Sequence, residues 1–173
     1  MKLLYFIVFL VCAFCCSTAS AEKPEWAVAL VNTKVHAFAS SDSSIIHELS
    51  IGDRLLIVER DVSGTWVRDR DSGWVLTSTT AFLRHLEKVR SWRGPKSIEI
   101  ENGDFSGTYQ FRRNGSFTLT SAGNDGADEY SGHLFKKGLV VFAKKSGEPD
   151  FGDVFVWNGA SFCWTTDSKQ CSK

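Results

Sequence analysis

The chain has 173 residues, with 20 Lys and Arg residues balanced by 20 Asp and Glu residues, so its formal net charge is zero. A chain without excess positive charge has no long-range attraction for phosphate backbones or anionic membranes, which argues against a nucleic-acid partner. No segment is low in complexity and no repeat of solenoid period occurs, so repeat architectures are excluded as well.

The N-terminal residues have the organisation of a secretory signal peptide. Lys2 precedes an apolar run over residues 3–16, and the small residues Ser17-Thr18-Ala19-Ser20-Ala21 follow it. A membrane-spanning helix needs ~20 apolar residues, and this run is shorter and ends in small polar side chains. The pattern predicts cleavage between Ala21 and Glu22, export to the periplasm or the medium, and no transmembrane segment after removal of residues 1–21. Because that segment carries one basic and no acidic residue, removing its 21 residues from 173 would leave 152 residues with a net charge near −1.

The remaining chain alternates between short apolar runs and turn-forming clusters. Runs rich in Val, Ile, Phe, Trp and Thr are separated by Gly, Asn, Asp and Ser, which is typical of antiparallel strands and their turns. We therefore predict an all-β fold. The predicted strands are 26–32, 45–49, 54–60, 65–69, 73–77, 107–112, 116–121, 129–136, 139–144, 153–157 and 161–165.

The first half of the mature chain contains five short motifs in a characteristic order. They are Val31-Asn32-Thr33-Lys34, Ser43-Ser44-Ile45-Ile46 with Leu49, Gly52-Asp53-Arg54-Leu55, Trp66-Val67-Arg68 after the turn at Gly64, and Gly73-Trp74-Val75. In order and spacing these motifs, over residues about 28–83, resemble the bacterial Src-homology-3 family of small exported barrels. A five-strand barrel could bury Ile45, Leu49, Leu55, Ile57, Trp66, Val67 and Val75. The chain departs from the family at Val35-His36-Ala37-Phe38-Ala39, where a Gly-Pro turn is usual.

The resemblance implies a binding function, because members of that family typically bind cell-wall peptides or other proteins, or serve as targeting modules beside a catalytic domain. The implied groove residues are Phe38, Asp42, Trp66, Arg68 and Trp74. An alternative interpretation is that Trp66 and Trp74 are large core residues, since tryptophan is mostly buried but often keeps one edge wet. His36 and His47 are too far from other ligand types to suggest a metal site, so we expect them to be structural.

A short helix is predicted between the two halves. Phe82, Leu83, Leu86 and Val89 recur at helical spacing, with charged residues between them. The domain organisation expected from the sequence is therefore a barrel over residues 26–78, a helical linker over 79–95 and a second antiparallel β-domain over 96–173.

The second half reads as a meander of hairpins. Asn114-Gly115 lies between two strand-like runs, and both residues accept the positive φ of a tight primed turn. Further turns are predicted at Lys136-Lys137-Gly138 and Asn158-Gly159-Ala160. With about six strands, this half resembles small exported barrels in a general lipocalin-like way, and it could enclose a small apolar ligand or form a packed core.

The last two cysteines are predicted to form a disulfide. Three of the five cysteines lie in the signal segment, which leaves Cys163 and Cys171 in an exported chain. Closing so short a loop would stabilise the fold by roughly 2.5 kcal/mol in the entropic description. The alternative, a reactive thiol, usually shows a closer Cys-x-x-Cys spacing or a dedicated base.

The motifs of a catalytic site are missing, so no catalytic residue, cofactor or metal is predicted. Neither a Gly-x-Ser-x-Gly elbow nor a convincing Cys and His pair occurs. The leading hypothesis is an exported non-enzymatic protein of the bacterial cell envelope that binds peptidoglycan or an envelope protein. Two alternatives remain: an inhibitor or immunity-type protein that blocks a secreted enzyme, and a hydrolase with its site in the C-terminal β-domain.

Overall fold

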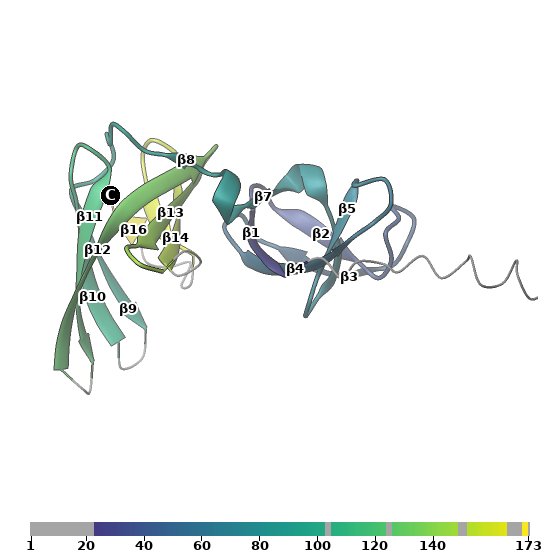
Figure 1. Cartoon of the computed structure of the whole chain (residues 1–173), viewed down its shortest axis with the longest axis horizontal. Coiled ribbons are helices and arrows are strands. Elements are labelled where there is room, and N and C mark those ends of the chain that lie inside the picture. Colours follow the sequence, from purple (N-terminus) through teal and green to yellow (C-terminus); the bar gives the residue numbers. More distant parts are fainter. Residues whose placement is uncertain (1–22, 103–104, 124–125, 149–151, 166–170, 173) are drawn as a thin grey trace, which may run out of the picture.

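The computed structural model describes residues 23–102, 105–123, 126–148, 152–165 and 171–172. The chain is 60% strand and 4% helical, which confirms the predicted all-β class. The strands form two antiparallel sheets that follow one another along the long axis of the molecule (Figure 1). The predicted signal peptide and its cleavage site between Ala21 and Glu22 lie outside the described residues.

The first sheet is barrel-like and nearly closed. Its strands are β1 (Glu25–Ala29), β2 (Thr33–His36), β3 (Ile45–Leu49), β4 (Arg54–Arg60), β5 (Trp66–Asp69), β6 (Gly73–Leu76) and β7 (Thr80–Phe82). Neighbouring strands pair in the order β3-β2-β6-β5-β4-β1-β7, with β3 and β7 at the two ends. The barrel core is mostly aliphatic and consists of Ala27, Val35, Leu55, Ile57, Val67, Val75 and Phe82.

Two of the expected barrel residues are not in that core. Ile45 is 48% exposed, so the prediction that it is buried is wrong. The physical reason is that the bulge in the β2–β3 pairing sets Ile45 opposite His36, on the outward side of the sheet, whereas the neighbouring Val35 points into the core. Trp66 is buried at 7% exposure, but it lies on the opposite side of its strand from the core residue Val67.

The second sheet is a meander, as predicted, with more strands than the sequence suggested. Its strands are β8 (Glu87–Lys88), β9 (Ser97–Asn102), β10 (Phe105–Phe111), β11 (Ser116–Gly123), β12 (Gly126–Lys137), β13 (Val140–Lys145), β14 (Gly152–Trp157), β15 (Phe162–Trp164) and β16 (Cys171–Ser172). From β9 to β16 each strand pairs with the next, and β8 pairs with β12. Aromatic rings dominate the interior, including Trp92, Tyr109, Phe111, Phe117, Phe155, Phe162 and Trp164.

The predicted hairpin at Asn114-Gly115 is present, but its turn type differs. The backbone N–H of Arg112 donates to the carbonyl of Ser116 across the turn. Gly115 has a φ of +79°, whereas no non-glycine residue in the described part of the chain has a positive φ. Asn114 therefore does not adopt the positive φ of a primed turn. Gly115 is also required for space, because a Cβ there would lie 2.1 Å from the carbonyl oxygen of Val89.

The predicted helical linker over residues 79–95 is wrong. Instead of an α-helix, the described segment contains two single 3₁₀ turns, η1 (Thr77–Thr79) and η2 (Leu83–His85), with β7 between them and β8 after them. The apolar residues do not share one helical face, because they enter three different clusters. Phe82 packs in the barrel core, Leu83 and Leu86 pack between the sheets, and Val89 packs in the second sheet.

The two sheets share a third apolar cluster. The cluster consists of Val28, Ala81, Leu83, Leu86, Val140, Phe142 and Val154. Gly52 approaches the second sheet so closely that a Cβ there would lie 2.3 Å from Cγ2 of Thr165. Nη1 of Arg54 donates to the carbonyl of Gly152 at 3.3 Å. The barrel and the meander are therefore packed against each other rather than joined by a free linker.

Candidate functional site

The outward side of the β5–β6 hairpin carries Trp66 and Trp74, two of the three tryptophans of the first half. Val67 and Val75 point into the barrel core, and neighbouring residues of a strand point to opposite faces. Trp66 and Trp74 therefore lie on the outside of the barrel, together with Arg68. Of the two interpretations left open by the sequence, the barrel core is excluded for these two rings.

The strand register arranges the outward residues in two cross-strand rows. In the first row, Ile45 is opposite His36, His36 is opposite Trp74, Trp74 is opposite Arg68, and Arg68 is opposite Glu59. In the second row, Glu48 is opposite Lys34 and Leu76 is opposite Trp66. We call this surface the outer face, and it consists of Lys34, His36, Ile45, Glu48, Glu59, Trp66, Arg68, Trp74 and Leu76.

The middle of the outer face is aromatic and firmly packed. The rings of His36 and Trp66 meet edge to face, with their centroids 5.1 Å apart. Both residues are buried, so they form the floor of the face. Trp74 is only half-buried and can offer its ring to a ligand. Nε of Arg68 pairs with Oε2 of Glu59 at 2.9 Å, and both side chains are about half exposed.

Asp61 fixes the start of β5 below these rings. Its carboxylate accepts hydrogen bonds from the hydroxyl of Ser63 and, at 2.7 Å, from the backbone N–H of Trp66. These hydrogen bonds, that of Ser63 first, lower the pKa of Asp61, because they stabilise its charged form. The turn before β5 thus positions Trp66.

The loop between β2 and β3 adds an exposed phenyl ring beside the outer face. Phe38 is 71% exposed. The hydroxyl of Ser43 donates to the carbonyl of Phe38 and accepts from the N–H of Phe38, which closes the loop. Nδ1 of His36 lies 3.3 Å from the carbonyl oxygen of Ser43, so the loop is held against the aromatic floor. Asp42 is exposed in the same loop, where its N–H donates to Oγ of Ser40.

A shallow hollow of about 370 Å³ adjoins the rings on the β2 side. It is lined by Asn32, Thr33, Lys34, His36, Glu48 and Leu76. Oδ1 of Asn32 is engaged, because it accepts a hydrogen bond from the N–H of Ile51 at 2.9 Å. The hollow thus has an aromatic and aliphatic floor and one side chain of each charge at its rim.

The structure brings together three of the five predicted groove residues, Trp66, Arg68 and Trp74, on one surface. Phe38 and Asp42 lie in the adjoining loop rather than on the strands. Sequence reasoning missed the contributions of Lys34, His36, Glu48 and Leu76. The alternation in Thr33-Lys34-Val35-His36, where Val35 is buried in the core, would have placed Lys34 and His36 on the outward side.

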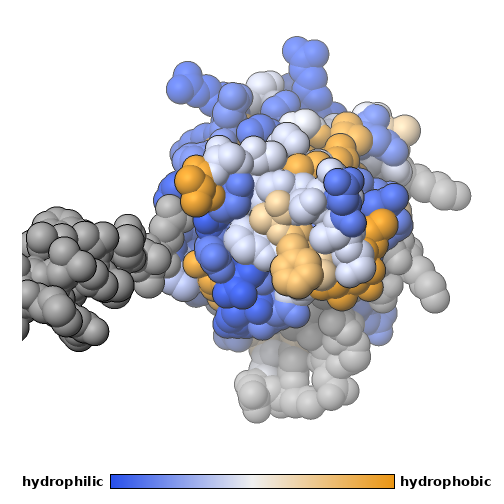
Figure 2. All heavy atoms as spheres, turned by 90° about the vertical axis from the view of Figure 1, so that its right-hand side faces the viewer, coloured by the Kyte–Doolittle hydropathy of each residue, from blue (hydrophilic) through white to orange (hydrophobic). Residues whose placement is uncertain are grey.

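Hydrophobic side chains also reach solvent at the far end of the barrel. Figure 2 views the end of the barrel that faces away from the second sheet, where hydrophobic groups are scattered among polar ones. The large exposed hydrophobic residues of the barrel are Val31, Phe38, Ile45, Ile46 and Val62.

The second sheet has a polar network inside its aromatic core. The hydroxyl of Tyr109 donates to Oδ2 of Asp153, and Nε1 of Trp164 donates to Oδ1 of the same carboxylate at 3.2 Å. Burial, and then the neighbouring charge of Asp153, raise the pKa of Tyr109 well above its ordinary value. Both carboxylate oxygens are occupied, so this network holds strands together rather than offering a reactive group.

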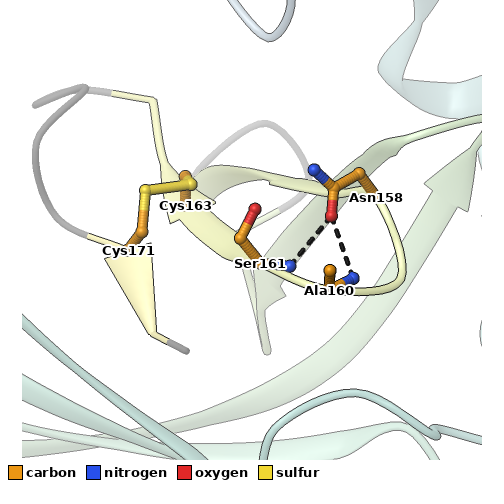
Figure 3. Close-up of a disulfide and its surroundings, with 5 residues drawn as sticks. All are labelled: Asn158, Ala160, Ser161, Cys163 and Cys171. Atoms are coloured by element: carbon orange, nitrogen blue, oxygen red, sulfur yellow. Dashed lines mark hydrogen bonds between the residues drawn. A yellow bond between two sulfur atoms is a disulfide. The ribbon is translucent and has the colours of Figure 1, made fainter.

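The predicted disulfide is present between Cys163 and Cys171. The two residues are directly opposite each other on β15 and β16, and Asn158 caps the neighbouring turn by accepting from the N–H groups of Ala160 and Ser161 (Figure 3). The reactive-thiol alternative is therefore excluded for Cys163 and Cys171 in this structure.

Neither a metal cluster nor a membrane helix is found in the described ranges. Within residues 23–102 and the later described segments, no group of three or more His, Cys, Asp or Glu side chains is placed to hold a metal ion. In the same part of the chain, no helix has the length and apolar character needed to cross a bilayer.

Comparisons with protein-family models, curated proteins and solved structures found no match to this chain. The outer face must therefore be interpreted from its own chemistry. It combines one accessible indole, a surface ion pair and side chains of both charges, and the adjoining loop adds an exposed phenyl ring. Such a surface can bind a chain-like ligand through stacking and polar contacts.

Proposed function

We propose that this chain is an exported, non-enzymatic binding protein of the bacterial cell envelope, with a Src-homology-3-like barrel as its binding module. The order of the motifs between Val31 and Val75 supports the assignment of the barrel, together with its nearly closed antiparallel sheet. The ligand is peptidoglycan or an envelope protein, and it binds on the outer face.

The observation that carries the proposal is the outward position of Trp74 between His36 and Arg68. Burying a large aromatic ring is favourable, so a half-exposed indole on the outside of a small barrel needs another reason. Aromatic and Arg side chains are the types that most often dominate binding energy at protein interfaces. In the outer face, Trp74 and Arg68 lie opposite each other on neighbouring strands.

The test is retention of the mature protein on purified peptidoglycan sacculi and on an envelope extract, in parallel. We expect retention on one of the two, reduced at least tenfold in affinity by Trp74→Ala, as for a central aromatic contact. Val62→Ala is the matched control, because Val62 is an exposed apolar residue of the same barrel outside the outer face.

Three outcomes would overturn the proposal. Retention on neither material would remove the envelope-binding function. A stoichiometric complex with a secreted enzyme would replace it with the inhibitor function. Hydrolysis of labelled cell wall by the purified protein would refute the assignment as a non-enzyme.

A further inference from the structure

Strand β3 is an open edge of the barrel sheet. Within the described residues it pairs with β2 alone. Four of its five residues are exposed, and Leu49 is the exception, half-buried against the barrel core. The other end strand, β7, has all three residues buried. The end strand β7 is therefore covered by neighbouring residues, whereas the end strand β3 faces solvent.

Open edges in natural sheets are usually blunted, because unpaired N–H and C=O groups invite pairing with another chain. The common devices are a short edge strand, a charged side chain such as Lys, a Pro, a β-bulge or a covering segment. Strand β3 contains neither Lys nor Pro and instead presents Ile45 and Ile46 at 48% and 54% exposure. The sheet does have a bulge where β3 passes His36, but the bulge leaves both isoleucines at the surface.

A further exposed apolar side chain lies beside this edge. Phe38 belongs to the loop that leads into β3, at the same end of the strand as Ile45 and Ile46. Phe38, Ile45 and Ile46 are three of the six large exposed hydrophobic residues in the described part of the chain. A concentration of this kind marks an interaction surface more often than isolated exposed residues do.

The negative charge of Glu48 at this edge indicates which charge the partner should carry. Glu48 is exposed on β3 and takes part in no ion pair among the described residues. Its cross-strand neighbour Lys34 is on β2, on the side of β3 away from the open edge. A strand added to the outside of β3 would place its own residue beside Glu48, and opposite charges at such positions attract.

We propose that the β3 edge accepts an extended polypeptide strand, with apolar side chains beside Ile45 and Ile46 and a Lys or Arg beside Glu48. The inference deepens the proposed function and rests on it, since it identifies the partner as a polypeptide and places it next to the outer face. A polypeptide is favoured over a glycan because only a peptide backbone can continue the ladder of main-chain hydrogen bonds.

The probe is a short capped peptide in which valine alternates with lysine, titrated into the mature protein. We expect binding together with slowed hydrogen exchange of the β3 amides. N-methylation of alternate amides along one edge of the peptide should abolish binding, whereas methylation along the other edge should not. Loss of binding with both methylated peptides, or with neither, would overturn strand addition.

Charge reversal supplies a second readout. Glu48→Lys should weaken the binding of the valine–lysine peptide roughly fivefold and favour a valine–glutamate peptide, as expected for a cross-strand pair whose sign is reversed. Glu99→Lys, at an exposed glutamate of the second sheet, is the matched control and should change neither affinity. Equal effects of both variants would show a general charge effect and contradict the inference.

The outcomes also separate this inference from the function on which it rests. If Trp74→Ala abolishes retention on sacculi or envelope extract while the β3 amides exchange as fast as in the free protein, the strand-addition inference fails and the binding function stands. Concentration-dependent protection of β3 in the protein alone would show that a second copy occupies the edge, and would also overturn it.

Discussion

The two sheets use their aromatic residues in opposite ways. In the barrel, the core is built almost entirely from Ala, Val, Leu and Ile, and the rings of Trp66 and Trp74 lie outside it. In the second sheet, rings such as Trp164 and Phe155 fill the interior. The difference shows that the role of a tryptophan in a small β-domain, in the core or on the surface, can be inferred only when the side of the strand to which it points is known. Inside rings stabilise the fold, whereas of the two outside rings Trp66 is buried and Trp74 stays half-exposed.

The comparison is tested most directly by truncating one tryptophan of each kind. Trp164→Ala should lower the free energy of unfolding by about 3–5 kcal/mol, because it leaves a cavity in the core. Trp74→Ala should cost only about 1 kcal/mol, because the ring is half in water already. Urea unfolding of both variants measures the two values. Equal losses would mean that Trp74 is a structural residue, and the contrast between the sheets would disappear.

Removing the disulfide tests how stable the second sheet is when only its aromatic core, and no covalent link, holds the strands together. Replacing both Cys163 and Cys171 by Ser should cost roughly 2.5 kcal/mol in the entropic description of an eight-residue separation. The variant should remain folded, since β9 to β15 do not depend on the link. The thermal unfolding temperature of the unmodified chain, measured with and without reductant, gives the effect of the disulfide. The double variant is the control, and reductant should not change its unfolding temperature.

The contact between the sheets is tested at Gly52. Gly52→Ala should destabilise the protein by about 2 kcal/mol, because φ is +91° there and the new Cβ meets Thr165. Gly64→Ala is the matched control: its φ is +70°, but a Cβ there has no heavy atom within 4 Å. The excess cost at Gly52 over Gly64 measures the packing of the two sheets. No excess would argue that they are independent.

The smallest effect is expected at Tyr109, where a polar group lies within the aromatic interior. Tyr109→Phe should cost about 1.5 kcal/mol, the lower end for a hydrogen bond to a charged group. The raised pKa of Tyr109 also makes stability depend on pH: the contribution is fully present below the ordinary pKa of 10.0 and is lost as the pH rises above it. Unfolding between pH 9 and 11 should show a shallower decline for Tyr109→Phe. Identical slopes would contradict the assignment.

The hydrophobic pattern of the sequence was sufficient to predict the fold class, the meander and the bounds of β3 and β4. It failed at residues 79–95, because apolar residues at helical spacing can also be shared among three cores by an extended chain. It missed β9, although Ser97-Ile98-Glu99-Ile100-Glu101-Asn102 alternates clearly, and β16, whose two residues pair only where Cys171 meets Cys163.

The candidate site was predicted in part. Motif order identified Trp66, Arg68 and Trp74, but a one-dimensional pattern does not show which strands become neighbours. His36 joins these residues only because β2 pairs with β6, far along the chain. The openness of β3 is likewise a property of the strand order, and no local feature of Ile45 and Ile46 distinguishes an edge strand from a central one.

The apolar cluster between the sheets determines how the molecule responds to force. If the barrel is held by a ligand and the second sheet is pulled, the force does not extend a flexible linker. It acts on the contact of Val28, Ala81 and Leu86 with Val140, Phe142 and Val154. The outer face therefore keeps a fixed orientation relative to the second sheet until that contact breaks.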